Sequence, residues 1–368
     1  MTEIINNAAR TKPRAAADET IERFAVPVRA RLRQLAHTSA GARDIIVSFP
    51  AAAVALASGR ADRSAHARAL AELADGANLR AIAQTLSLPR WLRGLPPEAI
   101  GATLPARALL PADDEVFGRA MLNRLPAQFA PNHVWLDRVA LARSRCDDDF
   151  AVWLGAGGAD VTEAQVSVLA AHDFFSKHAE LHAHALVGRG WAPRTPIPCA
   201  LTMTKLWLVR VQLKLQAENR GAKAVTPILF AGYSFEPLET AEALAAEGRA
   251  MRHCVGDYAM KVALGMSRIF SMRRAGRRIA TAEYMTPDWA KPELNQVCGV
   301  ENARPPAHAA MAARLFASTL VNVGDSTPSA PSIGAWRRFW APYWAAKGAH
   351  APFMTSPRSI TYLIDCLS

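Results

Sequence analysis

The sequence predicts an α+β protein that is mainly α, with a helical N-terminal part followed by a small C-terminal module of helices packed on a three-stranded antiparallel meander. Hydrophobic residues make up 51% of the 368 residues, which is enough apolar mass to bury a core. The excess of alanine over aromatic residues favours helix, and the 24 prolines keep the helices short. Strand-like runs follow only after Gly265.

The N-terminal part is expected to contain helices only. Its first helix is predicted from Ile21, Phe24 and Val28, apolar residues that recur at helical spacing after residues able to cap a helix. Pro-containing turns separate this helix from those that follow, because proline lacks the amide that a helix interior requires.

A domain boundary is predicted near residues 189–200, which contain three prolines and are expected to form an extended linker. A basic helix is expected next, over 203–219. The chain therefore divides into a helical N-terminal domain (1–190), an α+β module (200–323) and a loop with an aromatic C-terminal tail (324–368).

The module is predicted to begin with two helical pieces over 239–265 and to close with a helix over 305–321. Between them, a connection at 274–277 contains a glycine and favours a hairpin. The three strands are expected at 268–273, 278–285 and 294–300.

A cluster of chemically active residue types lies in this module. A cysteine nucleophile needs a base or a helix N-terminus that favours the thiolate, and amide groups can stabilise an oxyanion. Because strand residues alternate between faces, Glu283 and Thr281 are expected to point at the helix that carries Cys254, with Glu283 at least half buried and contacting a polar partner. The candidate catalytic residues are His253, Cys254, Glu283, Gln296 and Asn302.

Two considerations oppose an enzyme. Adjacent helix residues point about 100° apart, so His253 is not expected to activate Cys254 directly, and Glu283 or His308 has to serve as the base or orienter. Free cysteine is also often a small buried core residue.

Gly256, two residues after the cysteine, is expected to allow a close backbone approach or a positive φ.

The same segment resembles the PcfJ-like family. The resemblance rests on the run 247–258 with its His-Cys-Val-Gly core, on the Thr-x-Glu of Thr281 and Glu283, and on the Gln-x-x-Gly-x-x-Asn that begins at Gln296. The family is found on conjugative plasmids and other mobile elements of bacteria and phages. The resemblance therefore implies a protein of a mobile genetic element, without a defined activity.

The charge balance predicts an acidic partner such as DNA or RNA. Lys and Arg number 43 against 32 Asp and Glu, giving a net charge of +11 that is spread along the chain. The alternative is that an Arg- and Ala-rich composition reflects genome base bias and solubility. Arginine binds phosphate through forked donors, and the candidate nucleic-acid-binding residues are Arg268, Arg273, Arg274, Arg277 and Arg278.

The tail presents aromatic residues at spacings of three and four from Trp336 to Trp344, which predicts one aromatic helical face interrupted by Pro342. This face is expected to dock on the body of the protein. The alternatives are contact with a protein partner and stacking on bases.

No metal site or cofactor is predicted. His178 and His182 have the spacing of a helical metal site, but Ala179 stands where the zincin signature requires glutamate. The chain also lacks the glycine-rich motifs of nucleotide-driven motors and nicotinamide enzymes. A second conceivable zinc set matches no known ligand spacing, namely His253, Cys254, Cys298 and His308.

The location predicted from the sequence is the cytoplasm, with no membrane partner. The five cysteines are scattered and form no CxxC pair, which favours a reducing compartment. Residues 1–14 lack the apolar core of a secretory signal, and no apolar run approaches the ~20 residues that a membrane span requires.

Overall fold

The chain forms two compact units, one of residues 1–173 with 191–199 and one of residues 174–190 with 200–368. The computed structural model describes residues 15–58, 62–105, 115–127, 129, 134–158, 161–188, 190–219, 226–285, 292–320, 332–348, 364 and 367. No described helix is both long enough and apolar enough to cross a membrane.

The first unit is helical throughout its described residues, as the sequence predicts. The helix expected around Ile21, Phe24 and Val28 is divided, because α2 begins at Val26 with Pro27 in its first turn, yet all three apolar side chains are buried. The helices are α2 (Val26–Ala36), α3 (Ala40–Ser48), α4 (Pro50–Ser58), α5 (Arg63–Ala74), α6 (Leu79–Thr85), α7 (Glu115–Leu122), α8 (Trp135–Arg145), α9 (Asp148–Gly157) and α10 (Glu163–Lys177), whose last residues belong to the second unit.

The aromatic tail is a docked helix of the second unit, α16 (Ile333–Lys347), which tolerates Pro342 in its interior. Its residues Trp336, Trp340 and Tyr343 are fully buried, and the Trp340 ring lies 5.6 Å from that of Phe175 and 5.7 Å from that of Trp207. These three rings are therefore not part of a surface that a partner can reach. A loop is predicted from the sequence over 324–335. Residues 324–331 lie outside the described residues, and the end of the prediction was wrong, because Ser332 caps α16 and the helix begins at Ile333.

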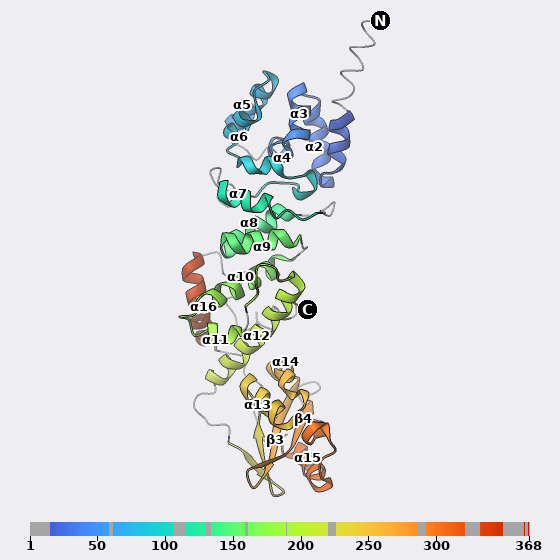
Figure 1. The fold of residues 1–368 in the computed structure, drawn as a ribbon, viewed down its shortest axis with the longest axis vertical. Helices are drawn as coiled ribbons and strands as arrows, with labels where there is room; N and C mark the ends of the chain where they lie inside the picture. The colour runs from blue at the N-terminus through green and yellow to red at the C-terminus, as the bar shows by residue number, and fades with distance from the viewer. Residues whose placement is uncertain are drawn as a thin grey trace. The chain divides into compact units, whose positions relative to one another are not determined.

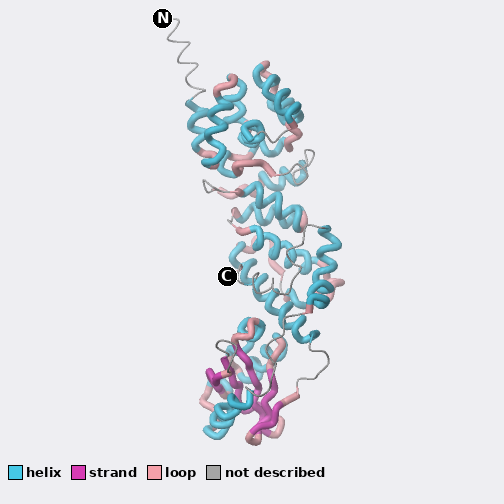
Figure 2. The backbone as a smooth tube through the Cα atoms, turned by 180° about the vertical axis from the view of Figure 1, so that it is seen from behind, coloured by secondary structure: helices cyan, strands magenta, loops and turns pink. Residues whose placement is uncertain are grey.

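The second unit also contains α11 (His184–Val187), most of α12 (Ile197–Asn219) and a five-stranded antiparallel sheet in the order β1-β2-β3-β4-β5. Its strands are magenta in Figure 2. The prediction of three strands was therefore wrong. The two further strands form a short hairpin with little sequence signal, because its first strand has three residues, too few for an alternating pattern. The strands are β1 (Ile228–Phe230), β2 (Tyr233–Pro237), β3 (Ser267–Arg274), β4 (Arg277–Met285) and β5 (Glu293–Cys298).

One face of this sheet is apolar and packs on α15 (Ala307–Leu320). The rings of Phe235 and Phe316 stack with their centroids 3.8 Å apart, and the hydroxyl of Tyr284 donates to the carbonyl of Ala313 at 2.8 Å. Ala280, Ala282 and Tyr284 lie on this face, as strand alternation predicts.

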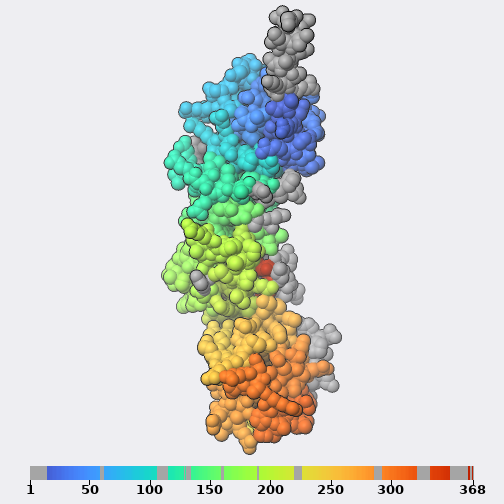
Figure 3. Space-filling model, turned by 45° about the vertical axis from the view of Figure 1, so that its right-hand side comes forward, coloured from blue at the N-terminus to red at the C-terminus, as the bar shows by residue number. Residues whose placement is uncertain are grey.

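The opposite face is polar and buried, and we call it the polar face. Its buried polar side chains are Ser267, Ser271, Thr281 and Glu283. It is covered by α13 (Ala241–Met251), the 3₁₀ turn η4 (Cys254–Tyr258) and α14 (Ala259–Ala263) (Figure 1). The described residues of 241–285 and 292–320, yellow to orange in Figure 3, pack together.

Close backbone packing joins α13 to η4. A Cβ atom built on Gly248 lies 3.0 Å from both the amide nitrogen of Gly256 and the carbonyl oxygen of His253. Gly256 itself has no positive φ, and a Cβ there meets its nearest atom, in Ala245, at an ordinary 3.6 Å. The expectation that Gly256 needs the freedom of glycine was therefore wrong, and the requirement lies at Gly248.

Gly248→Ala is expected to destabilise the second unit by about 1–3 kcal/mol, although alanine normally favours a helix, because two backbone atoms stand against the added methyl group. The matched control Gly256→Ala should change the free energy of unfolding by less than about 1 kcal/mol. Hydrogen exchange of the β3 and β4 amides measures both. Equal protection in the two variants contradicts the packing argument.

Candidate active site

An open pocket lies between the polar face and η4, with a volume of about 320 Å³ that includes its mouth. All five candidate catalytic residues line it, so the structure brings together the set that the sequence indicated. The lining residues are His253, Cys254, Val255, Tyr258, Ile269, Thr281, Glu283, Gln296, Cys298 and Asn302.

The Glu283 carboxylate accepts four hydrogen bonds in this site, and the residue is only 2% exposed. Its Oε1 accepts from the hydroxyl of Ser267 at 2.8 Å and the ammonium of Lys261 at 3.2 Å. Its Oε2 accepts from the amides of Asn295 and Gln296, both at 2.8 Å. The prediction that Glu283 is buried beside polar partners is confirmed.

These four donors decide what Glu283 can do. Burial by itself raises the pKa of this carboxyl, but the bonds from Ser267, Asn295 and Lys261 outweigh it and hold the pKa below its ordinary value. A carboxylate has about four acceptor positions, and all of them are occupied. Glu283 is therefore an ionised anchor that orients its donors, and it does not fit the role of base.

A β-bulge explains how two neighbouring residues reach the same carboxylate. Glu283 pairs with Gln296, and the next pair joins Tyr284 to Leu294, which leaves Asn295 as an extra residue on β5. In a regular strand Asn295 and Gln296 point to opposite faces, whereas a bulge redirects one of them. The sequence carried no signal for this bulge.

A second buried carboxylate, Glu247, belongs to the site and was missed as a functional residue. It is 1% exposed, and its Oε2 accepts from Nε of Arg278 at 2.7 Å. Its Oε1 accepts from the hydroxyl of Thr281 at 2.9 Å, and that hydroxyl lies 3.0 Å from Nε2 of His253. The available signal was the place of Glu247 on the apolar stripe of α13, with Leu244 and Met251.

His253 is not part of a helix. It precedes η4 with an extended backbone (φ −143°), and its Nδ1 accepts from the amide of Val255 at 3.5 Å. The expected divergence of neighbouring helical side chains therefore does not apply to His253 and Cys254, which line the same pocket.

Cys254 is exposed, so its interpretation as a buried core residue was wrong. Its thiol donates to the hydroxyl of Tyr258 at 3.7 Å, and the same hydroxyl accepts from Nε2 of Gln296 at 3.2 Å. The Gln296 bond lowers the pKa of Tyr258, but the Cys254 contact and burial raise it above its ordinary value. Cys254 is thus linked through Tyr258 and Gln296 to Glu283.

Cys298 lies in the pocket wall, whereas His308 lies outside the pocket. Burial, together with nearby Cys254 and Glu283, raises the pKa of the Cys298 thiol in the pocket wall. His308 stacks on Tyr233, part of the apolar core that includes α15, and does not line the pocket. His308 is therefore not the base that the sequence left open.

Left-handed backbone occurs at Asn302, which lines the pocket, and at two residues next to pocket-lining residues in the sequence. Arg252, Glu301 and Asn302 have φ values of 53°, 56° and 60°, which non-glycine residues rarely adopt. Arg252 and Glu301 form an ion pair of 2.6 Å. The Asn302 carboxamide lines the pocket and has no hydrogen-bond partner among the described residues, so it is available to a substrate. Such strain is concentrated at functional sites.

The arginines of the proposed nucleic-acid interface are divided by the structure. Arg273 pairs with Glu236 at 2.7 Å, Arg278 pairs with Glu247, and burial lowers the pKa of Arg268. Arg274 and Arg277 are exposed at the β3–β4 turn. Arg278 is exposed as well but is paired with Glu247, so Arg274 and Arg277 are the exposed members of the predicted set that form no ion pair among the described residues.

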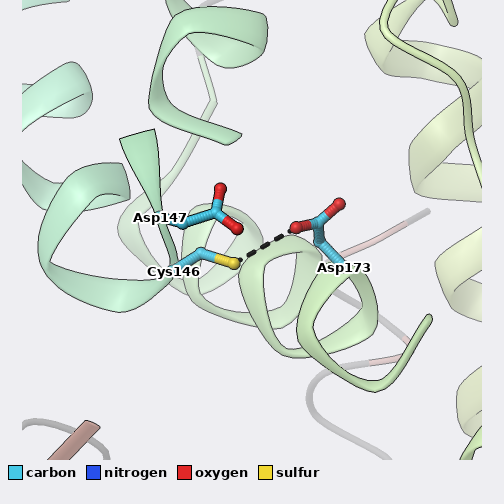
Figure 4. A group of neighbouring side chains, drawn as sticks. All are labelled: Cys146, Asp147 and Asp173. Carbon is cyan, nitrogen blue, oxygen red and sulfur yellow. Dashed lines mark hydrogen bonds between the residues drawn. The ribbon is translucent and has the colours of Figure 1, made fainter. Parts of the chain in front are cut away.

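A possible metal-ligand group lies in the first unit, where Cys146, Asp147 and Asp173 place their ligand atoms within 4.8 Å of one another (Figure 4). Cys146 donates to Asp173 at 3.2 Å, and Asp147 accepts from the amide of Phe150 at 2.8 Å, which caps α9. These groups have structural roles already. The pair His178 and His182 does not share a helix, because α10 ends at Lys177.

One comparison with known proteins finds a match over the part of the chain that carries the site. Residues 208–312 match the family model described as PcfJ-like protein, which confirms the resemblance seen in the sequence. The matched segment runs from the middle of α12 into α15 and contains every residue that lines the pocket. No curated protein and no solved structure matches this chain.

Glu283→Gln is expected to destabilise the polar face by about 3 kcal/mol at neutral pH, since one carboxylate oxygen becomes an amide that opposes two donors. The wild-type carboxyl has a lower pKa folded than unfolded. Its contribution is therefore present above the unfolded value of about 4.3 and is lost as the pH falls through the folded pKa. The variant should lack this acid-dependent loss.

Hydrogen exchange of β3 to β5 between neutral and acidic pH measures this difference. The matched control is Glu293→Gln, which removes an exposed carboxylate from the same sheet and should be near neutral. An equal effect of the two substitutions excludes an anchoring role for Glu283.

Proposed function

We propose that the PcfJ-like module is a cysteine-dependent enzyme, a hydrolase or a transferase, with Cys254 as its nucleophile. The observation that carries the proposal is the exposed Cys254 thiol in a pocket where two hydrogen-bond chains from buried carboxylates end. One chain runs from Glu283 to Cys254, and the other runs from Glu247 to His253.

The proposed reaction takes place at a carbonyl carbon. The Cys254 thiol loses its proton to His253 as sulfur bonds to the carbonyl carbon, and the leaving group departs with a proton from His253. Water, in a hydrolase, or another nucleophile, in a transferase, then breaks the carbon–sulfur bond and restores the thiol. Asn302 is the pocket amide available to bind the substrate, while Gln296 is held between Glu283 and Tyr258.

The nucleophile predicts unequal thiol reactivity in the native chain. Cys254 should react with iodoacetamide about tenfold or more faster than Cys199, which is also exposed but lies outside the pocket. Peptide mass spectrometry over a time course gives both rates from one sample, and Cys254→Ser identifies the signal. Equal rates for the two thiols, or protection of Cys254 until the chain is denatured, rule out an activated nucleophile.

A second candidate function is action near nucleic acid in a mobile genetic element. The net charge of +11 and the exposed Arg274 and Arg277 favour it. This function and the thiol chemistry can coexist in one chain, because the two arginines are not among the residues lining the pocket.

DNA or RNA is expected to bind weakly at low salt and to be released as the salt approaches the physiological concentration. Arg274→Ser with Arg277→Ser should lower the affinity and reduce the salt slope by about one for each lost phosphate contact. Arg63→Ser, an exposed arginine of the first unit, is the control. Fluorescence anisotropy measures the affinities. Binding that does not vary with salt, or no binding at low salt, argues against this function.

A further inference from the structure

We propose that Glu247 and Thr281 are positioning residues that hold His253 as its Nε2–H tautomer, so that the Nδ1 lone pair is the one that takes the proton of Cys254. This inference rests on the proposed function, because it describes how the base of that reaction is prepared. It assigns a role to a buried carboxylate and a buried hydroxyl on the polar face.

The direction of the hydrogen-bond chain follows from its inner end. Glu247 is buried and forms an ion pair with the guanidinium of Arg278, whose Nε donates to its Oε2 at 2.7 Å. An ionised carboxylate only accepts. The Thr281 hydroxyl, 2.9 Å from Glu247 Oε1, therefore donates its single proton to Glu247.

The direction of the hydrogen bond at the other end, between Thr281 and His253, then follows. With its proton committed to Glu247, the Thr281 oxygen can only accept from His253 Nε2 at 3.0 Å, so Nε2 carries a hydrogen. In a neutral imidazole the other nitrogen is the acceptor. An independent contact agrees, since the amide of Val255 points at Nδ1. At 3.5 Å this contact is long, which leaves the lone pair weakly held.

The proton transfer needs two local changes, because the Cys254 thiol turns from the Tyr258 hydroxyl to Nδ1 and the long Val255 contact is given up, while the inner chain stays as it is. When the proton of Cys254 reaches Nδ1, the imidazolium keeps its Nε2–H bond to Thr281, and Glu247 keeps its ion pair with Arg278. The same proton then leaves with the departing group. The intervening hydroxyl separates the imidazole from Glu247, so the carboxylate orients the base without taking its proton.

Nitrogen-15 NMR of the full chain labelled at histidine tests the tautomer, with the His253 signals identified by their loss in His253→Gln. The wild type should show the Nε2–H pattern of His253. Thr281→Val, which keeps the shape but removes the hydroxyl, should lose this fixed tautomer, and Thr281→Ser should retain it. Hydrogen exchange of β4 verifies that both variants fold.

The iodoacetamide rate of Cys254 provides the second readout. It should fall about tenfold or more in Thr281→Val and stay near the wild-type value in Thr281→Ser. A wild-type Nδ1–H tautomer overturns the inference. So does a reactive Cys254 whose rate is unchanged in Thr281→Val, although the nucleophile then stands. A wild-type Cys254 no faster than Cys199 overturns the proposed enzyme and the inference together.

Discussion

The ionised Glu283 carboxylate organises the candidate site because its four donors come from three different elements. Lys261 belongs to α14, Ser267 to β3, and Asn295 and Gln296 to β5. A buried carboxylate is costly unless it is fully bonded, so each of these elements has one position that satisfies it. The pocket wall is therefore fixed by the requirement to solvate one charge within the protein.

Two buried carboxylates, Glu283 on β4 and Glu247 on the covering helix α13, are a poor way to gain stability. Apolar residues of similar volume often stabilise a core as well as a buried ion pair does, and the opposite face of this sheet shows that arrangement with Phe316. Hydrogen bonds from the two carboxylates instead lead to Cys254 and His253, which line the pocket. Buried polar side chains in place of apolar ones are typical of functional sites.

The sequence predicted the parts of the fold that depend on local pattern, and it missed those that depend on pairing. Strand alternation predicted that Glu283 and Tyr284 lie on opposite faces of the sheet. The helical spacing of apolar residues predicted helices in the first unit. Three features depend on how strands pair and turns pack, and local pattern does not predict them. They are the short β1–β2 hairpin, the bulge at Asn295 and the left-handed backbone of Asn302. Glu247 was missed because a glutamate on a helix is usually solvated.

The net positive charge of the chain does not by itself describe the charges beside the pocket. Within the module, Arg278 neutralises Glu247, Lys261 neutralises Glu283, and Arg252 pairs with Glu301 at the pocket mouth. Both buried carboxylates beside the pocket are thus paired with a cation, and the net charge of +11 is not concentrated there by these pairs. The proposed thiol chemistry at a neutral carbonyl requires no unpaired cation, so it is separate from a phosphate contact at the β3–β4 turn, whose Arg274 and Arg277 do not line the pocket.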